Sequence, residues 1–406
     1  MVSLFTTERL VELYPRVKAF LEEEILPHEA EWLRMPFKEV ETLLEGKRTI
    51  ARATGAWNLY LPESLGGPGL TLTEVAQLGE LLGTTPFGHY CFNCQAPDAG
   101  NIELLAHYAQ GEIRERFLEP LLRGEIRSCF SMTEPEYAGS NPVMMGTTAV
   151  RDGDDYVING HKWFTTSADG AAFAIVMCIT DPEAPNPYQR ASMIIVPTDT
   201  PGFELVRNIP IMGQPGEGWL SHAEIRYTDV RVPVSYRLGE ANTGFRLAQE
   251  RLGPGRIHHC MRWIGIAERC FDLMCRRAAT RQLTERETLG DKQMVQQWIA
   301  ESRAQIDAAR YMVLHTAHTM DNQGQKAARH AVSTIKFFAS DMLMKVIDRT
   351  VQVHGALGVT DDCLASFYYR EERGARIYDG TDETHKAALA RRILKQYQPV
   401  ITNTTT

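Results

Sequence analysis

The sequence predicts an α+β protein with a helical N-terminal part, a β-rich middle and a helical C-terminal part. Two observations support this. Apolar residues recur at the three-and-four spacing of amphipathic helices near both ends of the chain. Between these regions, short runs of β-branched and apolar residues alternate with turn dipeptides, a pattern typical of a β-sandwich or barrel.

The composition narrows the class of protein. The chain has 406 residues, 44% hydrophobic and 23% charged, which excludes disordered, collagen-like and multispan membrane proteins. The formal net charge of -8 argues against a protein built mainly to bind nucleic acid. Eight cysteines are too few for a disulfide scaffold, and residues 1–30 lack an apolar signal segment. We therefore expect a cytoplasmic protein with no membrane span.

Residues 1–126 are expected to form the N-terminal helical domain. Leu10, Leu13 and Val17 lie on one face of a helix. A Pro- and Gly-rich stretch at 62–69 interrupts the helical pattern, which then resumes. The predicted helices cover residues 7–26, 73–82 and 99–123.

Residues 127–236 are expected to form the middle β-domain. Asp152-Gly153, Asn159-Gly160 and Pro201-Gly202 are turn signals between its strands, and Asn159-Gly160 predicts a tight hairpin turn. The predicted strands cover residues 128–132, 156–158, 161–166, 173–179, 193–197, 203–211 and 219–230.

Residues 237–406 are expected to form a C-terminal four-helix bundle, because the strand pattern stops after Pro233 and long amphipathic segments follow. The predicted helices cover residues 244–280, 291–320, 325–354 and 384–396.

Two segments of the β-domain have the residue types of a cofactor loop. Residues 130–140, F-S-M-T-E-P-E-Y-A-G-S, run from a strand into a loop, where backbone N–H groups and hydroxyls can hold a phosphate or a flavin edge. Taken alone, such a segment is an ordinary strand end. Residues 159–167, N-G-H-K-W-F-T-T-S, contain a Trp-Phe pair that by itself indicates core packing.

Together these segments resemble the acyl-CoA dehydrogenase family of flavoproteins, with its T-E-P-x-A-G-S loop and I-N-G-x-K-x-W-I-T hairpin. The resemblance continues through residues 231–233, 244–245, 352–355 and 377–381, and so covers essentially the whole chain. Residues 251–262 and 379–385 look most like the branch that includes the mammalian members 10 and 11. The resemblance implies the family fold, with an N-terminal helical domain, a middle β-domain and a C-terminal four-helix bundle.

The resemblance also implies FAD as cofactor and assigns candidate contacts. Candidate substrate contacts are Ser140, Arg256 and Gly380, although a lone arginine on a helix is normally solvated. Candidate FAD contacts are Phe130, Met132, Thr133, Gly139, Ser140, Phe164, Thr165, Thr166, Arg286, Gln297, Gln352, Val353, His354, Gly355, Thr381 and Glu383.

Members of the family oxidise acyl-CoA thioesters to trans-2-enoyl-CoA, as in fatty acid β-oxidation. A carboxylate removes the α-proton while the β-hydrogen leaves as hydride to flavin N5. Asp379 occupies the position of that base, where most members have the longer glutamate. Three interpretations of Asp379 stay open: a repositioned base, a D-G turn residue before a helix cap at Thr381 or Asp382, or a residue of a different reaction.

The resemblance further implies partners. Residues 286–290, R-E-T-L-G, resemble the R-x-T-F-G segment that with Gln297 and residues 352–358 reaches the FAD of a neighbouring subunit. This predicts a homodimer or homotetramer. The alternative is that 286–290 are simply the start of an amphipathic helix. An electron-transferring flavoprotein is the expected electron acceptor.

Two other patterns invite a functional interpretation that we reject. Cys91 and Cys94 have redox spacing without the surrounding βαβ pattern, so we expect an inert pair. His258, His259 and Cys260 are consecutive in a helix, point about 100° apart and cannot share one metal ion. We expect no metal site.

Two rival functions remain open. A flavin oxidase of the same fold, of the nitroalkane oxidase or acyl-CoA oxidase type, would differ in the oxygen reactivity of its reduced flavin. A non-catalytic flavin or CoA-ester binding scaffold would be expected to lack the base.

Overall fold

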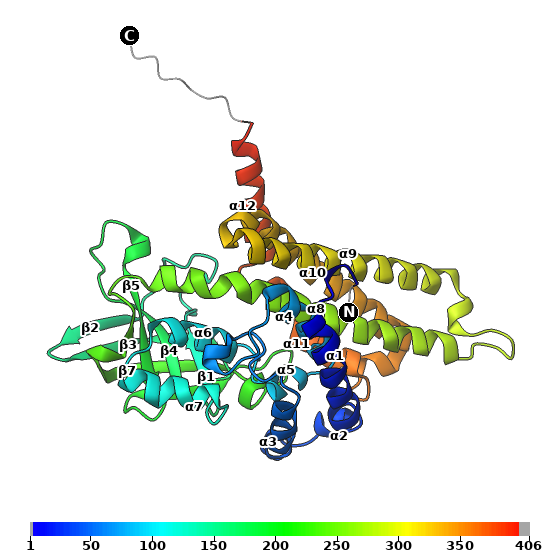
Figure 1. The fold of residues 1–406 in the computed structure, drawn as a ribbon, viewed down its shortest axis with the longest axis horizontal. Coiled ribbons are helices and arrows are strands. Elements are labelled where there is room, and N and C mark those ends of the chain that lie inside the picture. Colours follow the sequence, from blue (N-terminus) through cyan, green and yellow to red (C-terminus); the bar gives the residue numbers. More distant parts are fainter. Residues whose placement is uncertain (1–2, 398–406) are drawn as a thin grey trace, which may run out of the picture. The chain divides into compact units, whose positions relative to one another are not determined.

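A computed structural model describes residues 3–397 of the chain, without the side chains of residues 252–254. The residues cluster into two compact units, one ending at Gly255 and one beginning at Arg256. The first unit contains a helical part and a β-sheet, and the second is helical (Figure 1).

The helical part of the first unit forms around amphipathic segments. In α1, the apolar residues that the sequence analysis placed on one face are buried, and Thr7 caps the helix by accepting a hydrogen bond from the Leu10 N–H. Residues 37–53 also form a helix, which the sequence analysis did not include. The helices are α1 (Glu8–Phe20), α2 (Glu29–Trp32), α3 (Phe37–Ala53), α4 (Leu72–Leu82), α5 (Gly88–Cys91), α6 (Asp98–Tyr108) and α7 (Glu119–Leu122).

Within the described residues, the strands form one eight-stranded sheet in the order β6-β7-β3-β2-β4-β5-β8, with β1 paired to β4. The β1–β4 and β2–β4 pairs are parallel and the others antiparallel. The strands are β1 (Ser128–Ser131), β2 (Thr148–Asp152), β3 (Asp155–Thr166), β4 (Phe173–Ile179), β5 (Ala191–Pro197), β6 (Phe203–Asn208), β7 (His222–Pro233) and β8 (Arg237–Leu238).

The core of the first unit lies on β4 and β5. Both strands are almost wholly buried and consist almost entirely of apolar residues, as expected for strands covered on both faces. Helices α6 and α7 lie beside β1 and β4 in Figure 1, and Phe117 packs on Phe173 with ring centroids 4.9 Å apart. This packing fixes β1, whose end carries the first predicted cofactor motif.

The predicted turn at Asn159-Gly160 is wrong, because both residues lie inside the long strand β3. A bulge replaces the turn: the Asn159 amide exchanges hydrogen bonds with Asp229 on β7, at 3.0 Å to its carboxylate and 2.9 Å from its N–H. A Cβ at position 160 would lie 2.2 Å from Thr147 Oγ1. The glycine thus permits a close approach of neighbouring segments and makes no turn.

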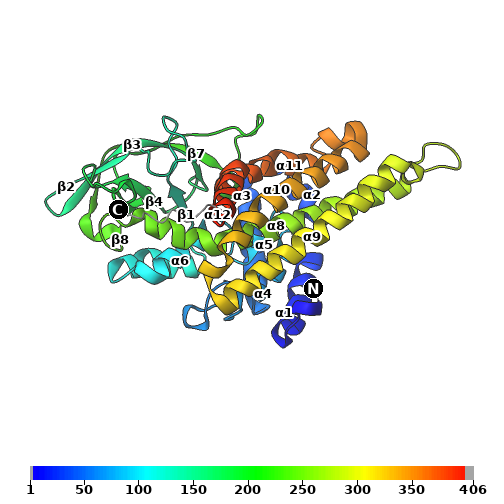
Figure 2. The same cartoon turned by 90° about the horizontal axis from the view of Figure 1, so that it is seen from above.

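The second unit is a helical domain around α10. Helices α9 and α10 run side by side in Figure 2, and α10 also packs against α11 and α12. The boundaries of α8 and α10 are the predicted ones. The helices are α8 (Gly244–Thr280), which begins in the first unit, α9 (Gln293–Gln323), α10 (Gln325–His354), α11 (Leu364–Glu372) and α12 (Asp382–Lys395).

Glu103, a half-buried acid in α6, makes the stability of the first unit depend on pH. Burial raises the pKa of the Glu103 carboxyl to about 7, although the charges of Arg251 and His107 oppose the shift. Because the pKa is raised, the folded state favours the protonated carboxyl. The contribution of Glu103 to the free energy of unfolding is therefore complete below pH 4.5 and is lost as the pH rises through 7. This loss lowers the free energy of unfolding by about 3 kcal/mol.

Glu103→Gln, which does not titrate, should therefore gain stability relative to the wild type between pH 4.5 and 8, by up to about 3 kcal/mol. Urea unfolding at both pH values measures this change. The exposed Glu115→Gln is the control and should differ from the wild type equally at both. If the free energy of unfolding of Glu103→Gln differed from that of the wild type by the same amount at both pH values, the prediction would be contradicted.

Candidate active site

The two cofactor motifs of the first unit are joined by reciprocal hydrogen bonds. The Thr133 hydroxyl donates to the Trp163 carbonyl at 2.8 Å, and the Trp163 N–H donates to the Thr133 carbonyl at 3.0 Å. Thr133 lies just after β1 and Trp163 lies in β3. The loop and the strand that the resemblance assigned to one cofactor thus form one surface in the structure.

A buried ion pair between Lys162 and Glu134 holds this loop in place. Lys162 Nζ lies 2.9 Å from Glu134 Oε1 and donates to the Met132 carbonyl at 2.8 Å. Glu134 also accepts from the Gly146 and Thr147 N–H groups at 2.5 and 2.9 Å. Burial alone would raise the pKa of Glu134, but Lys162 and these donors bring it below its ordinary value. The pair therefore holds both ends of the 135–145 loop.

The predicted contacts on β3 differ in what they can offer a cofactor. Phe164 is 42% exposed and has a φ of +48°, at an irregularity in the strand. Thr165 is fully buried, and its hydroxyl shares a hydrogen bond with Ser131. Thr166 is half-buried and shares one with His222 Nδ1 at 2.9 Å. Only Phe164 presents a largely exposed side chain.

The residues of this surface fit an FAD. Gly139 and Ser140 are exposed in the loop that Lys162 and Glu134 hold, so their backbone and the Ser140 hydroxyl can face a ligand. A Cβ at position 139 would lie 3.1 Å from Thr133 Cγ2, so glycine allows the loop to fold tightly there. The polar donors of this loop and the exposed Phe164 ring suit the polar and aromatic edges of a flavin.

In the second unit, Asp379 lies in a left-handed turn directly before α12. Asp379 and Gly380 have φ of +55° and +88°, and the Asp379 carbonyl accepts a hydrogen bond from His385 Nε2 at 3.1 Å. A Cβ at position 380 would lie 2.9 Å from His385 Nε2, so this turn requires glycine. Thr381 caps α12 by accepting from the Thr384 N–H. The D-G turn geometry is therefore present, and it fixes the backbone of the candidate base.

Asp382, three residues after Asp379, anchors this turn to the other helices of the second unit. Asp382 is fully buried and pairs with Lys336 and Arg376, each at 3.0 Å, while Ser340 donates to it at 2.9 Å. The start of α12 is thus held to α10 and to residues 373–376. Asp382 is structural, whereas the Asp379 side chain remains 21% exposed.

The Asp379 carboxylate faces α8. Its Oδ2 lies 3.1 Å from His259 Nε2. One turn earlier on the same helix, Arg256 is half-buried, and desolvation lowers its pKa while the Asp379 charge opposes that shift. The Arg256 Nε has no hydrogen-bond partner within the part of the chain that the structure describes. The candidate base and the candidate substrate arginine are thus electrostatically coupled.

The residues assigned to a neighbour's FAD lie at one end of the second unit. Val353 and Val295 belong to one buried cluster, against which Leu289 packs. This cluster brings together the segment that contains Arg286, the start of α9 and the end of α10. Arg286, Gln297, Gln352 and Gly355 are exposed there, His354 is half-buried, and Glu383 is exposed on α12.

The two rejected patterns have structural explanations. Cys91 and Cys94 are buried and free, and burial raises the pKa of the Cys91 thiol to about 12. Within residues 3–397, no cluster of His, Cys, Asp or Glu side chains could hold a metal ion. His258 and His259 are both half-buried, and desolvation lowers the pKa of His258 to about 4. In the described part of the chain, no helix has the length and hydrophobicity needed to cross a bilayer.

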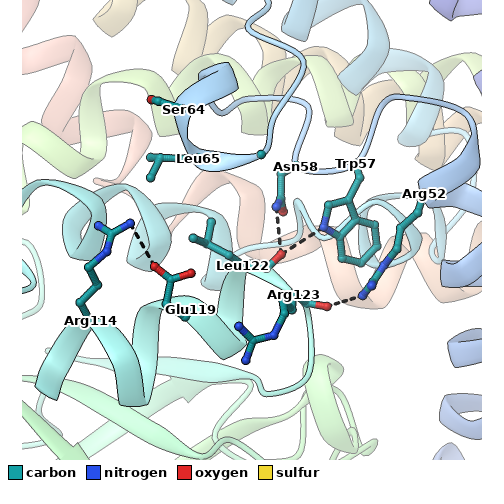
Figure 3. Close-up of a pocket in the computed structure, with 10 residues that line it drawn as sticks. Arg52, Trp57, Asn58, Ser64, Leu65, Arg114, Glu119, Leu122 and Arg123 are labelled. Atoms are coloured by element: carbon teal, nitrogen blue, oxygen red, sulfur yellow. Dashed lines mark hydrogen bonds and ion pairs between the residues drawn. The ribbon is translucent and has the colours of Figure 1, made fainter.

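A cavity of about 490 Å³ lies elsewhere in the first unit, beside α3 and α7, and includes none of the predicted site residues (Figure 3). Its charged side chains already have partners. Arg114 pairs with Glu119 at 3.0 Å, Arg123 with Glu125 at 2.7 Å, and Arg52 lies over the Trp57 ring. The cavity therefore gives no indication of a second ligand.

Sequence reasoning missed several residues around the candidate base and the cofactor loop. Arg256, His259 and Trp263 are spaced by three and four and so share a face of α8, which was a usable signal. The contact between that face and residues 378–379 gave no such signal, because more than a hundred residues separate the two segments in the sequence. The residues missed are Glu134, Lys162, His259, Arg262, Trp263, Glu372 and Tyr378.

Family models match most of the chain. The N-terminal domain of acyl-CoA dehydrogenases matches residues 7–125, the middle domain residues 129–230 and the C-terminal domain residues 242–394. "Probable acyl-CoA dehydrogenase FadE2" of Mycobacterium tuberculosis is 46% identical over 353 residues, covering 86% of this chain and 85% of the relative.

A longer relative and two solved structures are also similar to the chain. Acyl-CoA dehydrogenase family member 11 of Gallus gallus is 41% identical over 94% of this chain, which spans 50% of that protein's length. An acyl-CoA dehydrogenase homologue from Mycobacterium abscessus has a TM-score of 0.92 and 38% identity, covering 97% of this chain and 99% of its own. An acyl-CoA dehydrogenase from Geobacillus kaustophilus has a TM-score of 0.83 and 26% identity, covering 97% and 100%.

Proposed function

The chain belongs to the acyl-CoA dehydrogenase family, with FAD as its cofactor, and from this premise we propose that it converts an acyl-CoA thioester to the trans-2-enoyl-CoA. The observation that carries this proposal is the fixed and partly exposed Asp379 carboxylate at the start of α12. When bound, FAD supplies the hydride acceptor at flavin N5.

Asp379 is the general base in this proposal. Its carboxylate takes the α-proton of the thioester, and the proton stays on Asp379 until it leaves to solvent. Aspartate reaches about 1.5 Å less far than glutamate. The left-handed turn is therefore important, because it sets where the shorter side chain begins.

The remaining residues bind and orient. Negative charge that develops on the thioester oxygen needs hydrogen-bond donors, and we propose the Asp379 N–H as one of them. Ser140 and Arg256 are proposed to contact the acyl-CoA, together with Gly380. We propose that FAD is held by Phe164, Gly139, Ser140 and the residues around Thr133, because Phe164, Gly139 and Ser140 are exposed and Thr133 joins the loop to β3.

The wider role is proposed on the same basis. We divide the chain functionally into residues 1–126, 127–236 and 237–406, and assign it to fatty acid β-oxidation with an electron-transferring flavoprotein as acceptor. A cytoplasmic location is proposed from the sparse cysteines of the sequence.

Oxygen consumption tests this function against the oxidase alternative. The purified protein should turn over acyl-CoA with an electron-transferring flavoprotein or an artificial acceptor, and consume little oxygen without one. Oxygen uptake in step with enoyl-CoA formation would instead support an acyl-CoA oxidase. Turnover of nitroalkanes but of no acyl-CoA would overturn the proposal.

We further propose that the protein is a homodimer or D₂ homotetramer in which Arg286 reaches a neighbour's FAD. Arg286→Ala should then weaken FAD retention by about 10- to 100-fold, since a hydrogen bond to a charged group contributes about 1.5–3 kcal/mol. Dialysis followed by flavin absorbance measures the loss, and sedimentation gives the oligomeric state.

Arg281→Ala is the matched control, because Arg281 is an exposed arginine of the same connection. It should retain FAD like the wild type. A monomer that keeps FAD, or equal retention in both variants, would contradict the shared site.

A further inference from the structure

We propose that His259 is the positioning residue of the base: its Nε2–H donates a hydrogen bond to Asp379 Oδ2 and so orients the carboxylate that takes the α-proton. This inference rests on the proposed role of Asp379. It assigns a function to a histidine that the sequence analysis considered only as a rejected metal ligand.

The contact itself is within hydrogen-bond distance. The two atoms are 3.1 Å apart, and the side chains of His259 and Asp379 are 18% and 21% exposed. An ionised carboxylate is an acceptor only, so the nitrogen must donate. One oxygen of the carboxylate is thereby occupied, which fixes the rotation of the group.

The imidazole is held in place by aromatic neighbours. Its ring stacks on Trp263, one turn along α8, with centroids 5.9 Å apart and planes at 26°. It also contacts the Tyr378 ring, with centroids 5.2 Å apart. Because Tyr378 directly precedes Asp379, the same histidine contacts both the carboxylate and the residue before it.

Tyr378 is in turn anchored. Its hydroxyl accepts from Arg262 at 2.8 Å and from Trp263 Nε1 at 2.9 Å, and Arg262 is paired with the buried Glu372. The imidazole therefore lies against rigid groups. A donor that cannot move is the kind that holds a catalytic group to within fractions of an ångström.

The length of the aspartate explains why such a donor is needed. A base that reaches about 1.5 Å less than glutamate tolerates little misplacement, and a 1 Å error can cost about 100-fold in rate.

The test measures proton removal apart from hydride transfer. An acyl-CoA analogue with sulfur in place of the β-carbon can lose its α-proton but cannot donate hydride. In D₂O the holoenzyme should exchange the α-hydrogens of this analogue for deuterium, which mass spectrometry follows. Flavin reduction by a true substrate is measured in parallel.

His259→Leu should slow both deuterium exchange and flavin reduction by about 10- to 100-fold, with half-saturation by substrate changed less than about 3-fold. His259→Gln places an amide N–H near the same position and should recover rates to within about 5-fold of the wild type. If the leucine variant does not retain FAD, His259→Asn, whose amide ends short of Oδ2, replaces it with the same expectation.

His258→Gln is the matched control. His258 is the adjacent imidazole on α8 and points about 100° away, so its variant should exchange deuterium within about 2-fold of the wild type. Wild-type exchange in His259→Leu, or equal losses in the leucine and glutamine variants, would overturn the positioning role.

A different result is expected if the proposed function is wrong. If Asp379 is not the base, Asp379→Asn should exchange deuterium as fast as the wild type, whatever the His259 variants do. An inactive Asp379→Asn together with a fully active His259→Leu leaves the base in place and overturns only the inference about His259.

Discussion

Asp379→Asn should retain FAD and the fold, yet reduce its flavin with acyl-CoA at least about 10³-fold more slowly than the wild type. Asparagine has nearly the same volume and can keep the left-handed turn, in which asparagine is well tolerated. It has no basic oxygen to take the α-proton. Stopped-flow absorbance under anaerobic conditions, at saturating acyl-CoA, measures the rate.

Two further variants separate the base from a turn residue. Asp379→Glu should keep partial activity, because the longer carboxylate restores the commoner residue of the family but no longer fits the His259 contact. Asp361→Asn, which removes an exposed carboxylate from the same unit, should behave as the wild type. A modest loss of stability with undiminished flavin reduction in both Asp379 variants would leave Asp379 as a turn residue only.

Lys162→Met should destabilise the first unit by about 3–5 kcal/mol and weaken FAD retention. The substitution leaves the Glu134 carboxylate buried without its cation, which is among the costliest single changes in a protein core. It also frees the loop that carries Gly139 and Ser140. Urea unfolding and flavin retention after dialysis measure the two effects.

A double variant and a surface variant control for this result. Adding Glu134→Gln to Lys162→Met removes the uncompensated charge and should recover part of the lost stability. Arg231→Met breaks an exposed pair with Asp152 on the same sheet and should leave the stability almost unchanged. Equal effects in Lys162→Met and Arg231→Met would mean that the buried pair does not hold the loop.

The predictions from sequence were best where structure follows from local pattern. The long helices α8 and α10 begin and end at the predicted residues, because their amphipathic periodicity extends over many turns. Strand β4 was predicted at both ends for a similar reason, since its apolar run is bounded by turn residues.

Local pattern failed where a distant segment decides the structure. Asn159-Gly160 has the sequence of a tight turn, but Thr147 and Asp229 make it part of a bulged strand. Likewise, the spacing on α8 places His259 beside Arg256, but nothing local indicates that Asp379 lies against His259. The roles of residues 379–380 came from resemblance, whereas the groups that position them required the fold.

Anaerobic titration of the bound flavin with a panel of acyl-CoAs tests the central claim most directly. We predict that at least one acyl-CoA bleaches the flavin and yields one trans-2-enoyl-CoA for each FAD reduced, and that Asp379→Asn abolishes both. Flavin that stays oxidised with every acyl-CoA, or bleaching without formation of an enoyl-CoA, would contradict the account.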